Sequence, residues 1–142
     1  MLVGNLALVS AALFTGAAFY INFAEHPARM GLEDRPLLAQ WKPSYKRGLA
    51  MQSALAIIGF LLGLLAWWLT GRLAFILGGL LMIANWPWTL LAIMPTNNVL
   101  MATDLAAAGS ESRALLTRWN QLHAVRTGLG ALATVSFLFA LG

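Results

Sequence analysis

The chain has 142 residues and a net charge of +4, with 60% hydrophobic residues, 10% charged residues and no cysteine. Its length suits one domain covering residues 1–142, and its mean hydropathy of +0.75 is too high for an ordinary soluble core. The lack of cysteine excludes disulfides, iron–sulfur clusters and thiolate-ligated haem. Because little of the chain lies outside apolar runs, its positive charge indicates contact with membrane lipids and not with nucleic acid.

Four apolar stretches dominate the chain. A helix needs about 20 apolar residues to cross the hydrocarbon core of a bilayer, and the stretches are Leu2–Ala24, Gly48–Leu69, Leu73–Met94 and Leu122–Leu141. The first lacks a basic leading segment and is too long for the apolar part of a signal peptide, so we interpret it as a transmembrane helix. A tight turn at Thr70-Gly71-Arg72 joins the second and third. The predicted fold is therefore all-α, an antiparallel four-helix transmembrane bundle with two longer loops on one side.

Proline and capping residues predict where these helices end. Proline lacks a backbone N–H and disfavours helix in the residue before it. We expect Pro27 to limit the first helix and Pro43 to start the second. Pro87 is expected to kink the third helix, and Pro95 to stop it. In the loops, Asp34 is expected to cap a short helix, and Ser110 or Ser112 to cap the fourth transmembrane helix.

The distribution of basic residues predicts an orientation. With an even number of spans, both termini lie on one side together with the Thr70–Arg72 turn. Of the nine Lys and Arg residues, only Arg72 belongs to that side. The positive-inside rule then places the loops in the cytoplasm and both termini on the non-cytoplasmic side of an inner or plasma membrane. Gly59 and Gly63 form a small-xxx-small pair, which we interpret as helix packing. Whether copies of the chain form a homo-oligomer is left open.

Five polar clusters fall at the loop side of the predicted bundle. A charged or amide side chain near hydrocarbon is costly unless paired, so this convergence is a functional-site hypothesis. The clusters are Glu25-His26-Pro27, Trp41…Tyr45…Arg47, Asn85-Trp86-Pro87-Trp88-Thr89, Pro95-Thr96-Asn97-Asn98 and Trp119…His123…Arg126-Thr127.

The fourth helix carries the most suggestive cluster. Spacings of three and four residues place Trp119, His123, Arg126 and Thr127 on one helical face. In a purely structural interpretation, Arg126 extends to the lipid interface and His123 is a satisfied polar group. In a functional interpretation, His123 is a base, since the ordinary pKa of histidine is near neutral.

The other clusters allow two interpretations each. Glu25 is either an ion-pair partner of Arg47 or Arg126, or a carboxylate ligand or base. Asn85 and Thr89 either repair the backbone at the expected kink or line the mouth of a pocket. The amides after Pro95 either cap the third helix or order the rim of that pocket.

The sequence leaves the cofactor unknown. His26, His123 and Glu25 have the composition of a 2-His-1-carboxylate iron site, and two histidines at similar depth suit axial ligation of a haem. Neither pattern is specific, there is no motif for covalent haem attachment, and we assign no residue to a metal.

Several of these motifs together resemble the DUF1772 family of small four-helix membrane proteins, over nearly the whole chain. The most specific elements are Pro95-Thr96-Asn97 and Trp119-x-x-Leu122-His123-x-x-Arg126-Thr127. The others are Glu25-His26-Pro27-Ala28-Arg29, Trp41-Lys42-Pro43-Ser44-Tyr45-Lys46-Arg47-Gly48 and Trp86-Pro87-Trp88-Thr89. Some fungal members of that family are anthrone oxygenases of polyketide pathways. The resemblance implies a comparable fold and polar pocket, and a membrane-embedded oxidoreductase or oxygenase-like enzyme acting on a lipophilic, aromatic small molecule.

Under this hypothesis each polar residue receives a role. His123 is the expected base, Arg126 or Asn97 stabilises the oxyanion that forms, and Glu25 is the third catalytic candidate. Trp86, Trp119 and Tyr45 are expected to sandwich an aromatic ring. The substrate-binding candidates are His26, Trp41, Tyr45, Arg47, Asn85, Trp86, Thr89, Asn97, Trp119 and Thr127. The alternatives are a redox protein that binds haem, a metal or a quinone, a non-enzymatic binding or structural module, and a small transporter or channel.

Overall fold

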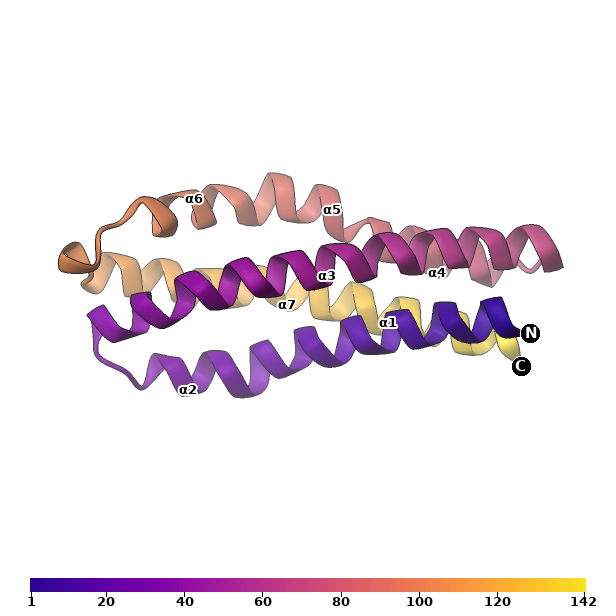
Figure 1. Cartoon of the computed structure of the whole chain (residues 1–142), viewed down its shortest axis with the longest axis horizontal. Helices are drawn as coiled ribbons and strands as arrows, with labels where there is room; N and C mark the ends of the chain where they lie inside the picture. The colour runs from indigo at the N-terminus through magenta and orange to yellow at the C-terminus, as the bar shows by residue number, and fades with distance from the viewer.

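The computed structural model describes all 142 residues, and its regular elements are all helical. Four rods lie side by side, with both termini at one end and the longer connections at the other (Figure 1). Predicted as an all-α antiparallel four-helix bundle with both loops on one side, the fold is confirmed. The rods are α1 (Leu2–Tyr20), η1 (Ile21–Glu25) and α2 (His26–Met30); α3 (Asp34–Thr70); α4 (Leu73–Ile83), α5 (Asn85–Trp88), η2 (Thr89–Ile93) and α6 (Met94–Ala102); and α7 (Ser110–Leu141), which follows the short turn η3 (Leu105–Ala107).

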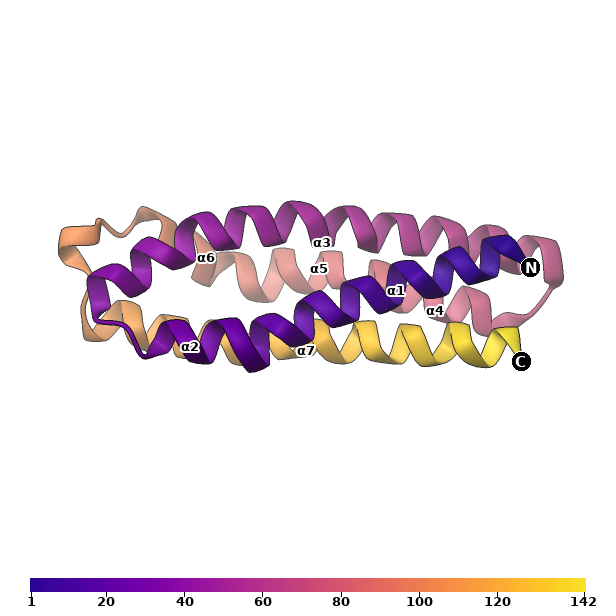
Figure 2. The ribbon, with the colours of Figure 1, turned by 60° about the horizontal axis from the view of Figure 1, so that its bottom comes forward.

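The rods form a closed square. α1 packs on α3 and α7, and α4 packs on the same two helices, so α1 and α4 are diagonal across the bundle. A view turned about the long axis shows the same arrangement, with α1 and α7 side by side and the third rod behind α3 (Figure 2). A square of this kind leaves a central column that side chains from all four rods can reach.

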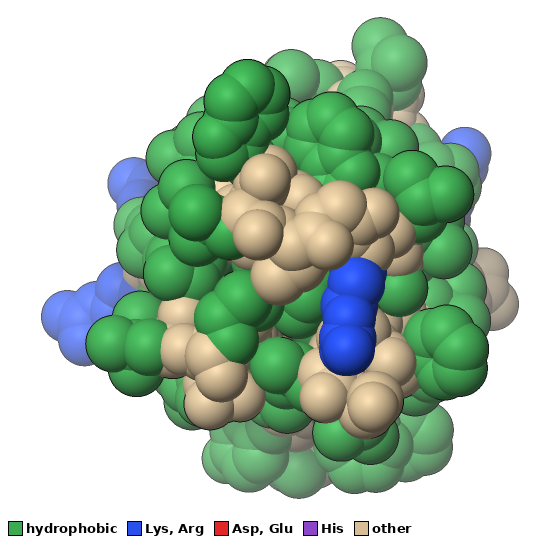
Figure 3. Space-filling model, turned by 90° about the vertical axis from the view of Figure 1, so that its right-hand side faces the viewer, with side chains coloured by type: hydrophobic (Ala, Val, Ile, Leu, Met, Phe, Trp, Pro, Cys, Tyr) green, Lys and Arg blue, Asp and Glu red, His purple; other side chains and the backbone are tan.

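Each rod is long and apolar enough to cross a membrane, which indicates an integral membrane protein. Large apolar side chains cover the outside of the bundle; Leu91 and Phe139 are 80% exposed, and Trp68 is 78% exposed. At the terminal end, hydrophobic side chains fill most of the face around a basic side chain (Figure 3). Arg72, which belongs to this end, donates to the backbone oxygen of Ala140 at 2.6 Å.

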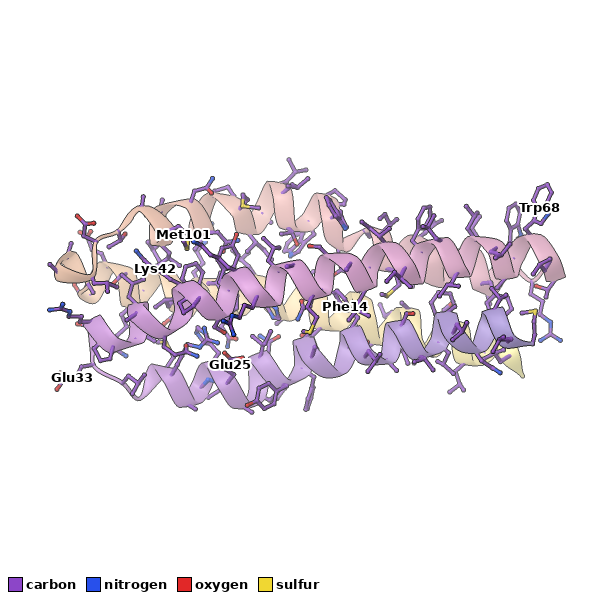
Figure 4. The ribbon with its side chains drawn as sticks, viewed as in Figure 1. Phe14, Glu25, Glu33, Lys42, Trp68 and Met101 are labelled. Carbon is purple, nitrogen blue, oxygen red and sulfur yellow. The ribbon has the colours of Figure 1, made fainter.

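Basic side chains close the opposite end. Arg113 on α7 pairs with Asp34 at 2.7 Å and also donates to the backbone oxygens of Met30 and Leu32 at 2.8 and 2.6 Å. Lys42 on α3 donates to the carbonyls that end α6, at Met101 and Thr103 (3.1 and 2.5 Å). Lys42 and Met101 accordingly lie close together in Figure 4. These contacts join residues of all four rods at the loop end.

The helices are longer than predicted, because the prolines do not end them. The first rod continues past Pro27 to Met30, and the third continues past Pro95 to Ala102. Both prolines follow a π-helical turn and lie in the first turn of the next α-helix, where a missing N–H costs nothing. The interruption expected near Pro87 is found at Ala84, between α4 and α5.

One predicted start is also wrong. The second rod starts at Asp34, with Pro43 inside it, because the buried side chains of Leu37, Leu38 and Trp41 hold the turns before the proline against the bundle. α7 starts at Ser110, close to the start that a cap at Ser110 or Ser112 predicts and twelve residues before its apolar run begins at Leu122.

Neither cap forms in the predicted way. Asp34 is the first residue of α3 and pairs with Arg113 instead of capping a helix. Gly109 precedes α7. The Ser112 hydroxyl accepts a hydrogen bond from the Gly109 N–H and donates one to the Gly109 carbonyl, both at 3.0 Å.

Two apolar clusters fill the interior at different heights. The cluster of the terminal half contains Ala7, Ala11, Phe14, Ala18, Ala56, Ala66, Phe75, Met82, Ala133, Phe137 and Ala140. The cluster of the loop half contains Leu37, Leu38, Trp41, Ile93, Leu100, Leu116 and Trp119. On every rod, the residues between the two clusters include buried polar side chains, so a polar layer separates two apolar cores.

Candidate functional site

The polar layer is the candidate site. Its members are all less than 9% exposed, and they are Asn22, His26, Arg29, Gln52, Asn85, Thr89, Asn97, His123 and Arg126. In Figure 4, side-chain nitrogen gathers in the half toward the loops, near Glu25, whereas the half toward the termini is mostly carbon. Arg126 lies about 22 Å along α7 from Leu141, at ~1.5 Å per residue, and a hydrocarbon core is about 30 Å thick. A hydrocarbon core that begins at Leu141 would therefore contain the layer in its loop-side third.

Two π-helical turns flank this layer. η1 contains Asn22, and η2 contains Thr89; both side chains are buried. A π turn inserts an extra residue, which shifts every following side chain round the helix, and such turns are frequent at functional sites. After η1, the buried residues are His26 and Arg29, so the turn aims both toward the interior.

Asn22 fixes the orientation of the His123 imidazole. The Asn22 Nδ2 group donates to the backbone oxygen of Asn120 at 2.9 Å and to the side-chain Oδ1 of Asn120 at 2.7 Å. A carbonyl only accepts, so the Asn22 Oδ1 must be the atom that faces His123 Nδ1 at 2.9 Å and the Thr127 hydroxyl at 2.6 Å. His123 Nδ1 therefore carries the proton and donates it, and Nε2 keeps the lone pair of a base.

Arg126 has no anionic partner. Its side chain is 5% exposed, one turn from His123, and the two ion pairs of the structure are Arg29–Glu25 and Arg113–Asp34. Its Nε makes no hydrogen bond, and its guanidinium carbon lies 5.6 Å from the centre of the Phe14 ring. Arginine stays protonated in proteins, so this is a buried positive charge without a counter-ion.

Glu25 does pair with an arginine, as predicted, but with Arg29 and not with Arg47 or Arg126. The Arg29 Nη2 lies 2.7 Å from Glu25 Oε1, which also accepts from Gln40 Nε2 at 3.2 Å and from the Ser44 hydroxyl. Arg29 is 3% exposed and its Nε and Nη1 lack partners. Glu25 is therefore engaged at one oxygen by three donors.

Two cavities open in the polar layer. The polar cavity has a volume of about 20 Å³, enough for a water molecule or a small end group. Its lining is Ile21, Arg29, Ser44, Tyr45, Gly48, Leu49, Gln52, Ile93, Asn97, Trp119, His123 and Arg126. The apolar pocket has a volume of about 130 Å³, and its lining is Leu49, Ser53, Ala56, Asn85, Trp86, Thr89, Leu90, Met94 and Arg126. Leu49 and Arg126 belong to both, so the two spaces are neighbours with Arg126 between them.

The structure divides the predicted site residues among several places. The polar cavity brings together Tyr45, Asn97, Trp119, His123 and Arg126. The apolar pocket contains Asn85, Trp86 and Thr89, again with Arg126. Five others lie elsewhere. Glu25 and the exposed Arg47 share an outer groove, His26 and Trp41 are buried against Trp119 beside the polar cavity, and Thr127 hydrogen-bonds to Asn22.

The structure places the three rings that were expected to sandwich a substrate in two different spaces. Trp86 lines the apolar pocket, whereas Trp119 and Tyr45 line the polar cavity. Tyr45 stacks on Trp41 at 4.8 Å between ring centroids, and Trp119 meets Trp41 edge-on at 5.9 Å. Tyr45, Trp41 and Trp119 thus pack on one another, whereas Trp86 lines the separate apolar pocket.

Sequence reasoning missed Asn22, Arg29 and Gln52 as site residues. Arg29 had a signal, because it follows Glu25 by four residues and such pairs meet on a helix. Asn22 and Gln52 are amides in otherwise apolar runs, which is itself a reason to expect a partner inside the bundle. The sequence does not say which of several such amides faces inward.

The histidines do not assemble a metal or haem site. No group of three or more His, Cys, Asp or Glu side chains comes together to hold a metal ion. Axial ligation needs two imidazoles that face one iron from opposite sides. Here both pack against the Trp119 indole, His26 at 5.2 Å and His123 at 4.9 Å between ring centroids.

The fold and site together define a small four-helix membrane protein with a buried, positively charged polar site beside an apolar pocket. The family model described as anthrone oxygenase, which corresponds to DUF1772, matches residues 41–136, and the chain belongs to this family. No curated protein and no solved structure matches the chain. The match includes Tyr45, Asn97, His123 and Arg126 but not the residues of η1 and α2.

Proposed function

We propose that the protein is a membrane-embedded oxygenase that acts on a lipophilic, aromatic small molecule of the anthrone type. The observation that carries the proposal is the pair His123 and Arg126, which line one buried cavity. His123 offers a base of defined tautomer, and Arg126 offers a positive charge that no carboxylate neutralises. Family membership supports the same reaction class.

The chemistry follows from these two side chains. His123 Nε2 takes a proton from the carbon opposite the carbonyl of the anthrone, and the oxyanion that results lies against Arg126. Dioxygen adds to the carbanion carbon to give a hydroperoxide, which loses water as the second carbonyl forms. Anthrone and O₂ thus give anthraquinone and water, with O₂ as the oxidant. Both reactants dissolve in hydrocarbon, which suits a site inside the membrane.

The apolar pocket suits the ring system of such a substrate. Leu49, Ala56 and Met94 contribute apolar surface, and Trp86 contributes an indole. Trp86 and Leu90 lie on the exposed surface between α3 and the third rod, where lipid would surround the protein. We therefore propose that the substrate enters from the bilayer and that its reactive edge points past Arg126 toward His123.

Substitution of His123 tests the proposal. With anthrone and dissolved oxygen, we expect His123→Ala and His123→Gln both to abolish anthraquinone formation, because neither side chain can accept the proton. Both should melt near the wild-type temperature in detergent, and Gln121→Ala, exposed on the same helix, should keep full turnover. A purely structural role gives the opposite order: a marked loss of melting temperature in Ala that Gln largely restores.

A further inference from the structure

We propose that the polar cavity is a preformed binding site for a carboxylate, and that the natural ligand is a lipophilic acid whose ring or chain lies in the apolar pocket. The inference rests on the proposed function for the claim that one small molecule spans both spaces. It goes further in naming a group that is ionised before any reaction. The argument has three steps: charge, hydrogen bonding and shape.

The charge of the polar cavity is unbalanced. Its lining includes Arg29 and Arg126 but no Asp or Glu. Glu25 lies outside the lining and pairs with Arg29, which leaves Arg126 without a counter-ion. A guanidinium cannot discharge itself by losing a proton, and an uncompensated charge within a membrane helix is strongly penalised. A bound anion removes that penalty, whereas a bound water molecule does not.

The hydrogen-bonding groups around the cavity are also unsatisfied. Gln52 and Asn97 are each 1% exposed, and neither amide has a partner at its nitrogen or its oxygen. Arg29 keeps two nitrogens free, and Arg126 keeps its Nε free. Buried polar groups are almost always paired, so four such side chains around one small space indicate a site built to bind a polar ligand.

The number of donors favours a carboxylate. A carboxylate has two oxygens and about four lone-pair positions, and guanidinium groups match its planar shape. Arg29, Arg126, Gln52 and Asn97 together can occupy those positions, whereas a single phenolate oxygen would leave several of the donors unpaired. The cavity, at about 20 Å³, has room for such an end group but not for a whole ring system. The rest of the molecule must then lie in the neighbouring apolar pocket, across the shared Leu49 and Arg126.

The test compares an acid with its uncharged amide. The full chain is purified in an uncharged detergent, so that no anionic lipid competes, and binding of 2-naphthoate, 2-naphthamide and acetate is measured by equilibrium dialysis. We expect 2-naphthoate to bind about 10-fold or more tightly than 2-naphthamide, as expected for gained hydrogen bonds between charged groups. Acetate should bind far more weakly than 2-naphthoate, because it leaves the apolar pocket empty.

Variants then assign the preference to Arg126. Arg126→Gln should remove the preference for the acid, and Arg126→Lys should keep part of it. Arg118→Gln, an exposed arginine on the same helix, should keep all of it. Equal binding of acid and amide by the wild-type chain overturns the proposal without any variant, even if Arg126→Gln does not fold. Binding of acetate as tight as that of 2-naphthoate also overturns the proposal. So does a loss of the preference for the acid in Arg118→Gln that equals the loss in Arg126→Gln.

The experiments distinguish failure of the carboxylate-site proposal from failure of the oxygenase proposal. His123→Gln should keep the preference for 2-naphthoate while it loses oxidation of anthrone, because the carboxylate is held by groups other than the base. If the preference persists but no anthrone is oxidised by the wild type, the carboxylate site stands and the oxygenase proposal fails. If anthrone is oxidised but the acid has no advantage, the oxygenase proposal stands and the carboxylate site fails.

Discussion

At the scale of single residues, the most consequential contact is the one between Asn22 and His123. A base is useful only if the nitrogen that faces the substrate is unprotonated, and a neutral imidazole has two tautomers. Asn22 selects one of them, because its amide nitrogen is committed to Asn120 and only its oxygen is left for the ring. This positioning role resembles that of a buried carboxylate behind a catalytic histidine, but it adds no negative charge beside Arg126.

Asn22→Ala should therefore lower turnover of anthrone by about 10–100-fold, comparable to the cost of losing a hydrogen-bond partner that orients a metal-ligating histidine. Thr127→Val should cost much less, since it removes a donor to Asn22 Oδ1 and leaves the bond to His123 in place. Nitrogen NMR of labelled histidine should report the Nδ1-protonated form in the wild type and in Thr127→Val, and a mixture in Asn22→Ala. An unchanged tautomer in Asn22→Ala would contradict the argument.

At the scale of elements, the two hairpins are built alike. In the first rod of each hairpin, a proline lies six residues after the first residue of a π turn. Pro27 follows Ile21 in this way, and Pro95 follows Thr89. Two residues beyond the prolines lie Arg29 and Asn97, which both line the polar cavity. In the second rod of each hairpin, a tryptophan lies four residues before a side chain that lines the polar cavity. Trp41 precedes Tyr45, and Trp119 precedes His123. Equivalent positions of the two hairpins thus supply opposite walls of one site.

Close helix packing in the terminal half depends on glycine. A Cβ atom on Gly63 would lie 2.9 Å from the Phe137 ring and 2.9 Å from the backbone oxygen of Phe75, and a backbone oxygen cannot move aside. Gly63→Ala should therefore destabilise the bundle by about 1–3 kcal/mol, the usual cost of overpacking. Gly16→Ala is the control, because nothing lies within 4 Å of the added atom. Thermal melting in detergent should separate the two, and equal melting temperatures would show that α3 and α4 can move apart.

At the scale of the whole molecule, the alternation of apolar core, polar layer and apolar core was only partly predictable. The four apolar runs and the even number of crossings predict the bundle and the convergence of polar clusters at one end, because span length is set by the bilayer. The helix ends were not predictable from the prolines. Each helix continues past Pro27 or Pro95 because a π turn precedes the proline, and local helix propensities do not predict a π turn. The separation of two cavities by Arg126 was not predictable either, because it depends on how side chains from four rods pack.

The orientation of the bundle also belongs to this scale, and we propose that the loop end faces the cytoplasm. Eight of the nine Lys and Arg residues lie toward that end, and the cytoplasmic loops of membrane proteins carry an excess of Lys and Arg. Glu33 is exposed at the loop end and Arg72 is exposed at the terminal end, so the two positions report on opposite sides. Because the chain has no cysteine, Glu33→Cys and Arg72→Cys each introduce a single label site. A membrane-impermeant maleimide should label Arg72→Cys in intact cells, and Glu33→Cys only after the membrane is opened. The reverse pattern would place the polar site on the outer side and would direct the search for its substrate there.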